Sequence, residues 1–110
     1  VDRIKELIIT GGENVYPKDV EGALFSHPDI EDAVVVGIPD KEYGEKVVAL
    51  VVTKKQTNIT KEALKEYLKS KLSPFKVPKE FYFVDAIPRS PTGKIFRRDI
   101  KRFILDNFIK

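Results

Sequence analysis

The residue with the clearest chemical potential is Lys94, in the segment RSPTGKIFRR. Thr92 and Gly93 predict a tight exposed turn before it, because glycine accepts backbone angles that other residues avoid. An ammonium group held there on a flexible stem suits negative charge that develops on a phosphate or carboxylate. The alternative is an ordinary solvated basic turn. This segment alone does not distinguish the two. For Arg97 and Arg98 the two alternatives are a contact with phosphate and the solvated first turn of the last helix, and we favour the second.

Two residue types that often carry catalysis are scarce. The chain has one histidine and no cysteine. The lack of cysteine excludes disulfides, thiol catalysis and cysteine-based metal sites. The histidine, His27, comes directly before Pro28, and a residue before proline is biased away from helix. We therefore interpret His27 as a helix terminator with a local hydrogen bond. We expect no metal site and no catalytic histidine.

Length and composition predict one small domain. The chain has 110 residues, of which 42% are hydrophobic, enough for a modest core. Its 20 basic and 17 acidic residues give a net charge of +3, weak support for a polyanionic ligand. We expect no signal peptide and no transmembrane segment. We expect a cytoplasmic location. Because methionine is absent even from position 1, we also expect a fragment or a processed product.

The pattern of apolar residues predicts an α+β domain, a small three-stranded sheet with flanking helices and an N-terminal β-hairpin. β-Branched runs indicate strands, and apolar residues spaced by three and four positions indicate helices. In chain order the expected elements are a strand over 4–10, an extended segment at 15–16, a helix over 17–26, strands over 31–38 and 46–53, a helix over 61–72 capped by Thr60, an extended segment at 75–78, a strand over 80–84 and a helix over 96–107.

Five sequence blocks follow one another along nearly the whole chain. They are DRIKELIITGGENVYPKDVE at 2–21, SHPDI at 26–30 with AVVVGIPD at 33–40, GE at 44–45, FKVPK at 75–79 and PRSPTGK at 88–94. In this order they resemble the C-terminal lid domain of the adenylate-forming enzymes, which include acyl-CoA synthetases, aryl-CoA ligases, firefly luciferase and peptide-synthetase adenylation domains. The GGENVYP form resembles the fatty-acyl and aryl CoA ligases most, which favours an acyl-CoA synthetase of the fatty-acid–CoA ligase type.

The resemblance implies a reaction in two halves. A carboxylic acid attacks the α-phosphate of ATP, bound with Mg, to give an acyl-adenylate and pyrophosphate, and the thiol of CoA then displaces AMP. The lid rotates between the halves, so that each of its faces serves one reaction. Residues 1–110 would be this lid, an excised fragment with its hinge near 2–6. Without the missing N-terminal adenylation domain it would be inactive and would hold no cofactor.

The resemblance also assigns roles to single residues. Lys94 matches the family's adenylation lysine, whose ammonium would bridge the attacking carboxylate and the α-phosphate. Arg3 matches an arginine that contacts the nucleotide, and Lys5 falls at the hinge. Gly11 and Gly12 match a glycine loop beside the pantetheine channel, where absent side chains let the thiol arm pass. The alternative for Arg3 is a surface arginine, and for Lys5 an exposed lysine of a strand. For Gly11 and Gly12 it is a plain hairpin turn.

Three further residues are candidates for binding CoA. Tyr43 lies where related ligases can place an aromatic ring near the CoA adenine, and Phe75 and Lys79 are similarly placed near the CoA nucleotide. A stacked ring and a cation near the 3′-phosphate would be reasonable chemistry. Ordinary surface residues are the alternative at all three positions.

Two other function classes stay open at this point. A small sheet with helices and a basic surface is also typical of nucleic-acid-binding modules, although the strands lack the interleaved exposed aromatics that stack bases. The second alternative is an interaction module that keeps the lid fold without the chemistry. We favour the lid domain, and with it the expectation of a small-molecule carboxylic acid, ATP and CoA as partners rather than nucleic acid.

Overall fold

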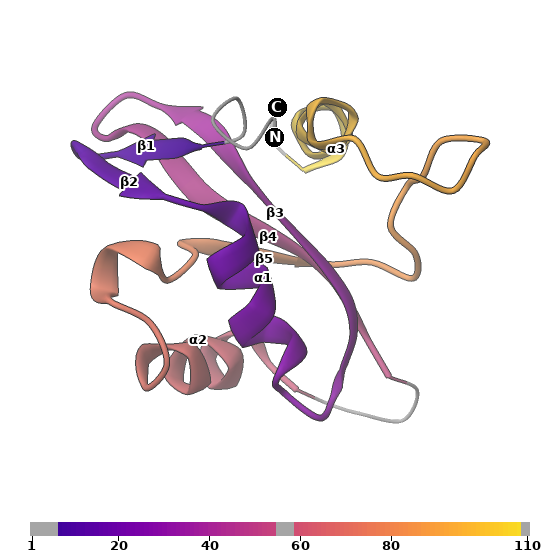
Figure 1. Cartoon of the computed structure of the whole chain (residues 1–110), viewed down its shortest axis with the longest axis horizontal. Coiled ribbons are helices and arrows are strands. Elements are labelled where there is room, and N and C mark those ends of the chain that lie inside the picture. Colours follow the sequence, from indigo (N-terminus) through magenta and orange to yellow (C-terminus); the bar gives the residue numbers. More distant parts are fainter. Residues whose placement is uncertain (1–6, 55–58, 109–110) are drawn as a thin grey trace.

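The computed structural model describes residues 7–54 and 59–108. Within them the longest helix has 11 residues, and no helix is long and apolar enough to cross a lipid bilayer. In chain order the elements are β1 (Ile8–Thr10), β2 (Glu13–Val15), α1 (Pro17–Phe25), β3 (Ile30–Asp40), β4 (Gly44–Thr53), α2 (Lys61–Lys69), the 3-10 helix η2 (Pro74–Lys76), β5 (Glu80–Phe83) and α3 (Arg97–Asn107) (Figure 1).

Two sheets make up the β-structure of the described residues. The larger has the order β3-β4-β5, in which β3 is antiparallel and β5 parallel to the central strand β4. The smaller is the antiparallel hairpin β1-β2. The prediction of an α+β domain with a three-stranded sheet, flanking helices and an N-terminal hairpin is confirmed.

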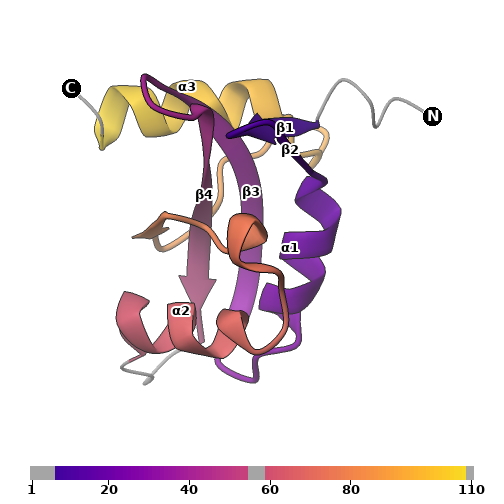
Figure 2. The ribbon, with the colours of Figure 1, turned by 90° about the vertical axis from the view of Figure 1, so that its left-hand side faces the viewer.

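Both faces of the larger sheet are buried, because successive side chains of β3 and β4 point to opposite faces and both sets are apolar. On one face Val35 and Ala49 join a core with residues of α1, α2 and the hairpin. On the other face Val36 and Leu50 join a core with Ile100 and other residues of α3. In Figure 1 the sheet runs between α3 and the pair α1 and α2, and Figure 2 shows α3 crossing one end of the strands.

Local sequence signals explain several boundaries. The hairpin turn consists of Gly11 and Gly12, with φ of 56° and 82°, and positive φ at both central residues is what a two-residue hairpin turn favours. Helix α1 begins at Pro17, whose fixed φ suits a first helical position. Helix α2 begins after Thr60, whose hydroxyl accepts a hydrogen bond from the Ala63 N–H at 3.0 Å, as expected of an N-cap.

Strands β3 and β4 run closer to their shared turn than expected, to Asp40 and from Gly44 rather than to 38 and from 46. Two further differences from the expected boundaries have a local cause. Helix α2 ends at Lys69 rather than near Leu72, because the backbone tightens there: the Ser70 N–H donates to the Tyr67 carbonyl at 3.3 Å. The segment expected to be extended at 75–78 begins with the 3-10 turn η2. Pro74 opens that turn, and the Val77 N–H closes it on the Pro74 carbonyl at 3.3 Å.

The cap of α2 gives a test of these assignments. Thr60→Ala removes an N-cap acceptor and should lower the free energy of unfolding by about 1 kcal/mol. Ser73→Ala is the matched control, because Ser73 occupies the corresponding position before η2 without a side-chain capping bond; it should change stability by less than ~0.5 kcal/mol. Urea unfolding of the 110-residue chain measures both, and equal losses would contradict the capping role.

Candidate functional site

The loop between β5 and α3 carries Lys94 and projects from the body of the domain (Figure 1). Its tip is a closed turn, in which the Ser90 N–H donates to the Lys94 carbonyl and the Gly93 N–H donates to the Ser90 carbonyl, each at 2.8 Å. The Lys94 N–H donates to the Ser90 hydroxyl oxygen at 3.2 Å. Gly93 has φ 88°, which glycine adopts without steric cost. The predicted tight turn is therefore confirmed.

The side chain of Lys94 is exposed at this tip. Among the residues that the structure describes, its ammonium has no hydrogen bond or ion pair. A cation of this kind can meet an incoming anion without first breaking an internal contact, while its backbone stays fixed by the turn.

The end of this loop is tied to the body of the domain through Arg97. One guanidinium nitrogen, Nη2, donates to both carboxylate oxygens of Glu21, at 2.7 and 2.8 Å. Nε donates to the Val35 carbonyl at 3.2 Å, and the Val35 N–H donates to Glu21 Oε2 at 2.8 Å. The two charged side chains are only 17% and 13% exposed. The expectation that Arg97 belongs to a solvated first turn is wrong.

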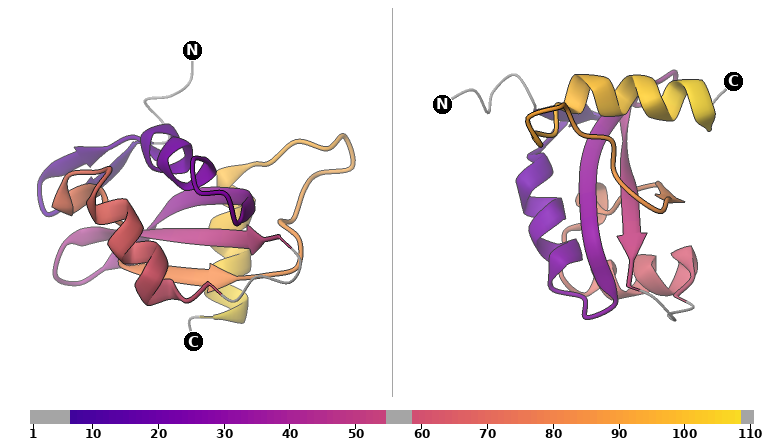
Figure 3. Two further views of the ribbon diagram at one scale, coloured as in Figure 1. Left: turned by 90° about the horizontal axis from the view of Figure 1, so that it is seen from below. Right: turned by 90° about the vertical axis from the view of Figure 1, so that its right-hand side faces the viewer.

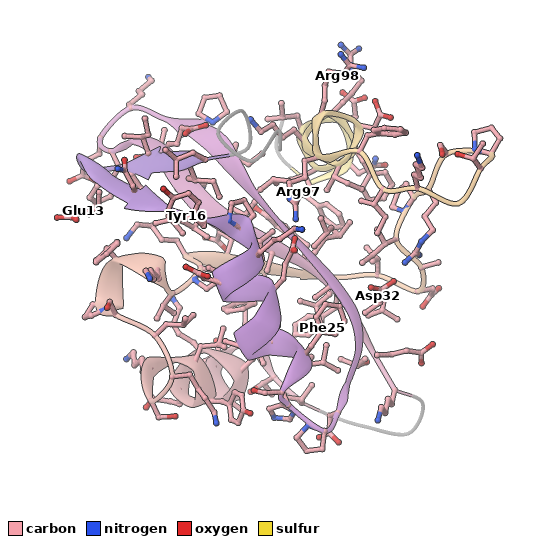
Figure 4. All side chains as sticks on the ribbon, viewed as in Figure 1. Glu13, Tyr16, Phe25, Asp32, Arg97 and Arg98 are labelled. Carbon is pink, nitrogen blue, oxygen red and sulfur yellow. The ribbon has the colours of Figure 1, made fainter. Side chains whose placement is uncertain are left out.

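Arg98, the next residue, behaves as expected. Figure 4 shows its side chain pointing outward from α3, whereas Arg97 points toward α1. Adjacent positions of a helix face different directions, so one arginine reaches Glu21 and the other stays exposed.

The start of the same loop is tied to β3 as well. Arg89 Nη2 donates to Asp32 Oδ2 at 2.7 Å, with the arginine side chain 42% exposed and the aspartate 22%. Asp32 lies in β3 three positions before Val35. The segment that carries Lys94 therefore has an ion pair at each end, and both pairs are anchored on β3, at positions three residues apart.

Three of the residues expected to serve CoA, namely Gly11, Tyr43 and Lys79, meet at the other end of the domain. The Gly11 N–H donates to the Tyr43 carbonyl at 2.8 Å, and the ammonium of Lys79 lies 4.4 Å from the centroid of the Tyr43 ring. A cation over an aromatic face is attracted by the negative face of the ring. Residues 11, 43 and 79 thus form one cluster, although they come from three distant parts of the sequence.

This cluster is held by the turn between β3 and β4 and by the hairpin. Asp40 Oδ2 accepts hydrogen bonds from the N–H groups of Glu42 and Tyr43, at 3.1 and 2.8 Å. Glu45 Oε1 accepts one from the Ile9 N–H at 2.9 Å, which fastens β1 to β4. A Cβ atom on Gly11 would lie 3.3 Å from Cδ1 of Tyr43, so the close approach of hairpin and ring depends on glycine.

Lys79 also lines a groove of about 420 Å³. The groove is lined by apolar residues that include Leu72, and by Lys65 and Lys69 from α2. Three ammonium groups around an apolar depression suit a ligand that carries both a flat apolar part and phosphates.

The two candidate regions lie at opposite ends of the domain. In Figure 3 the hairpin β1-β2 and the loop that carries Lys94 extend to opposite sides. Gly12 shares the hairpin turn with Gly11, and Phe75 is exposed on η2, which lies against β2. Arg3 and Lys5, the residues expected to bind nucleotide and to form the hinge, lie outside the described residues.

His27 is a structural residue, as the sequence predicted. Its Nδ1 accepts a hydrogen bond from the Asp29 N–H at 3.0 Å, and its ring meets that of Tyr67 edge-on at 4.6 Å. In the part of the chain that is described, no group of three histidine, cysteine, aspartate or glutamate side chains is placed to hold a metal ion.

Sequence reasoning missed the pair of Glu21 and Arg97. One weak signal was available, because an arginine in the first turn of a helix faces the positive end of the helix dipole and is disfavoured without a nearby anion. That signal indicates a partner but not which carboxylate supplies it, since Glu21 lies 76 positions away.

Comparison with known proteins gives a consistent picture. A profile of the AMP-binding enzyme C-terminal domain matches residues 19–94, and Lys94 is the last residue matched. The chain is 42% identical over 107 residues to a 2-succinylbenzoate–CoA ligase of Geobacillus sp. (strain WCH70), covering 97% of this chain and 22% of that protein. It is 49% identical over 98 residues to the oxalate–CoA ligase of Saccharomyces cerevisiae, covering 89% and 18%.

Solved structures agree with these sequence matches. A fatty acyl CoA synthetase of Mycobacterium tuberculosis superposes with a TM-score of 0.86 at 39% identity, over 92% of this chain and 20% of that one. The chain thus spans about a fifth of the length of these relatives.

Alanine substitutions at two glycines should change the free energy of unfolding in opposite directions. Gly11→Ala places a side chain at positive φ and against Tyr43, so it should lower the free energy of unfolding by roughly 1–2 kcal/mol. Gly22→Ala, in the middle of α1 with open space around its Cβ position, should raise it by about 0.5–1 kcal/mol. Chemical denaturation of the two variants measures the difference, and a stabilising Gly11→Ala would show that the turn does not need glycine.

Proposed function

The chain belongs to the AMP-binding enzyme C-terminal domain family, and from this membership we propose that it is the lid of an ATP-dependent acid–CoA ligase. The ligase activates a carboxylic acid as an acyl-adenylate and transfers the acyl group to CoA. The observation that carries the proposal is Lys94, an exposed ammonium without a partner in 7–54 and 59–108, on a turn that internal hydrogen bonds hold in place.

In the first half-reaction Lys94 acts on developing charge. A carboxylate oxygen of the acid bonds to the α-phosphorus of ATP as the bond to pyrophosphate breaks, and negative charge is shared among the oxygens around phosphorus. An ammonium beside the carboxylate and the α-phosphate offsets that charge in the transition state. Lys94 supplies no proton and forms no bond, so its contribution depends on position.

In the second half-reaction the opposite end of the lid serves CoA. The thiol attacks the acyl carbonyl, and AMP leaves. Gly11 and Gly12 line the path of the pantetheine arm, and Tyr43 and Lys79 meet the CoA nucleotide. This assignment is supported by the contact between Gly11 and Tyr43 and by the position of Lys79 over the Tyr43 ring.

The other parts of the ligase are partners in this proposal. A large N-terminal adenylation domain supplies the acid pocket and the phosphate-binding loop, and ATP acts with Mg. Arg3 as a nucleotide contact and Lys5 as the hinge stay predictions. The preference for a fatty acid also stays a prediction, because the relatives' names include 2-succinylbenzoate and oxalate as well as fatty acyl substrates.

The covered sheet argues against the nucleic-acid alternative. Modules that stack bases on a sheet need an open face with exposed aromatic residues. Here α1 and α2 cover one face of the larger sheet and α3 crosses the other.

Lys94→Ala in the complete ligase that carries this domain tests the first assignment. Formation of the acyl-adenylate, measured as ATP–pyrophosphate exchange, should fall ~100-fold or more, because one preorganised charge contact is lost. Thioester formation from preformed acyl-adenylate should be largely kept. Arg98→Ala is the control for lost positive charge and should change neither rate more than about twofold. Equal losses of rate in both half-reactions would contradict the role given to Lys94.

Lys79→Ala tests the second assignment in the same ligase. The KM for CoA should rise about fivefold, corresponding to ~1 kcal/mol for a charge contact at a solvated surface, while ATP–pyrophosphate exchange stays unchanged. Lys71→Ala is the matched control, because Lys71 also lies over a tyrosine ring, that of Tyr67, at 5.2 Å but away from the hairpin. An unchanged KM for CoA in Lys79→Ala would remove Lys79 from the CoA site.

A further inference from the structure

We propose that Arg97 and Glu21 are positioning residues for Lys94. Their ion pair fixes the end of the Lys94 loop to strand β3, so that the ammonium is presented at a set position for the adenylation step. This inference rests on the proposed function for its catalytic consequence, but its structural part can be measured on the chain by itself.

The pair occupies the open edge of β3. In the order β3-β4-β5, the described part of the chain gives β3 a neighbouring strand on one side only, and Val35 directs both its N–H and its carbonyl to the other side. Glu21 accepts from that N–H at 2.8 Å, and Arg97 donates to that carbonyl at 3.2 Å. The two side chains therefore take the place of a neighbouring strand at this position, where unpaired backbone groups would be costly.

Stability alone is a poor explanation for this arrangement. Both side chains are nearly buried, and the loss of hydration offsets much of the attraction in a buried ion pair. The position of Arg97 at the start of α3 also opposes the helix dipole. What the four hydrogen bonds do supply is geometry. They fix the guanidinium against the Glu21 carboxylate from α1 and the Val35 carbonyl from β3, and they fix the same carboxylate against the Val35 N–H.

That geometry passes to Lys94 through a short connection. Only two residues separate Lys94 from Arg97, and the turn that precedes them is closed by hydrogen bonds between Ser90 and Lys94. At its start the loop is held by Arg89 on Asp32, a more exposed pair. Because Asp32 and Val35 belong to the same strand, the two attachments together restrict movement of the turn relative to β3.

Arg97 is therefore not assigned as a ligand of the nucleotide. Its Nη2 and Nε atoms are already engaged by Glu21 and Val35, whereas Lys94 is exposed. A misplacement of about 1 Å can cost up to ~100-fold in rate, so a residue that touches no substrate can still control the step.

The kinetic test uses the complete ligase with Arg97→Gln, Glu21→Gln, the double variant and Arg98→Gln as control. Each single variant of the pair should lower kcat for ATP–pyrophosphate exchange about 10- to 100-fold, with the KM for ATP and the transfer from preformed acyl-adenylate little changed. The double variant should be no worse than the worse single variant, because both remove one interaction. Arg98→Gln should lie within about twofold of the parent.

Two kinetic outcomes would overturn the proposal. A raised KM for ATP with unchanged kcat would make Arg97 a nucleotide ligand, and equal loss of both half-reactions with a lowered Tm would make the pair a stability element only.

Amide hydrogen exchange on the 110-residue chain separates this inference from the proposed function. In Arg97→Gln the N–H groups of Ser90 and Gly93 should exchange at least tenfold faster than in the parent, while Leu50 in the central strand keeps its protection and shows that the fold is intact. Arg98→Gln should leave the exchange rates of all three N–H groups unchanged. Unaltered exchange at Ser90 and Gly93 would refute the positioning role, whatever the ligase assays show. Faster exchange with no kinetic effect of Lys94→Ala would instead refute the proposed function of the lysine.

Discussion

The antiparallel pair β3-β4 is apolar on both faces, and the rest of the structure depends on this constraint. A strand pair buried on one face can leave the other to solvent or to a ligand, but here both faces require cover. Helices α1 and α2 close one face and α3 packs on the other. Both faces of the sheet are therefore inaccessible to a ligand. The candidate functional groups, Lys94 and the cluster of Gly11, Tyr43 and Lys79, lie at the two ends of the domain. Under the proposed function, a rotating lid can use both ends because they belong to one body.

Helices α1 and α3 lie on opposite faces of the sheet, and the ion pair of Glu21 and Arg97 joins them around the edge of β3. This connection does not pass through either apolar core. It links the two layers at Val35, where the edge strand would otherwise leave an N–H and a carbonyl without partners. The loop that carries Lys94 begins and ends beside the same edge, so the position of the lysine follows from the layering of the whole domain (Figure 4).

The features that the sequence predicts well are those that depend on near neighbours. The alternating valines of β3 and β4, the cap at Thr60, the turn at Gly11 and Gly12, and the exposed turn before Lys94 all follow from residues within a few positions. The Glu21–Arg97 pair and the meeting of Lys79 with Tyr43 join residues 76 and 36 positions apart, and no local pattern encodes either contact. The resemblance to a known family supplied the candidate residues of the CoA cluster, but the contact between them is visible only in the folded chain.

The parallel pairing of β4 and β5 has a consequence for the way the domain assembles. β3 and β4 are joined by the three residues 41–43, and such a hairpin closes at little cost in chain entropy. β5 runs parallel to β4 and can dock only after the chain from Lys54 to Lys79 has crossed back along the sheet. We therefore expect the hairpin of β3 and β4 to form early and β5 to add late, since pairing across a long connection is intrinsically slow. Lys79 directly precedes β5, so the cluster with Tyr43 would be completed among the last contacts of folding.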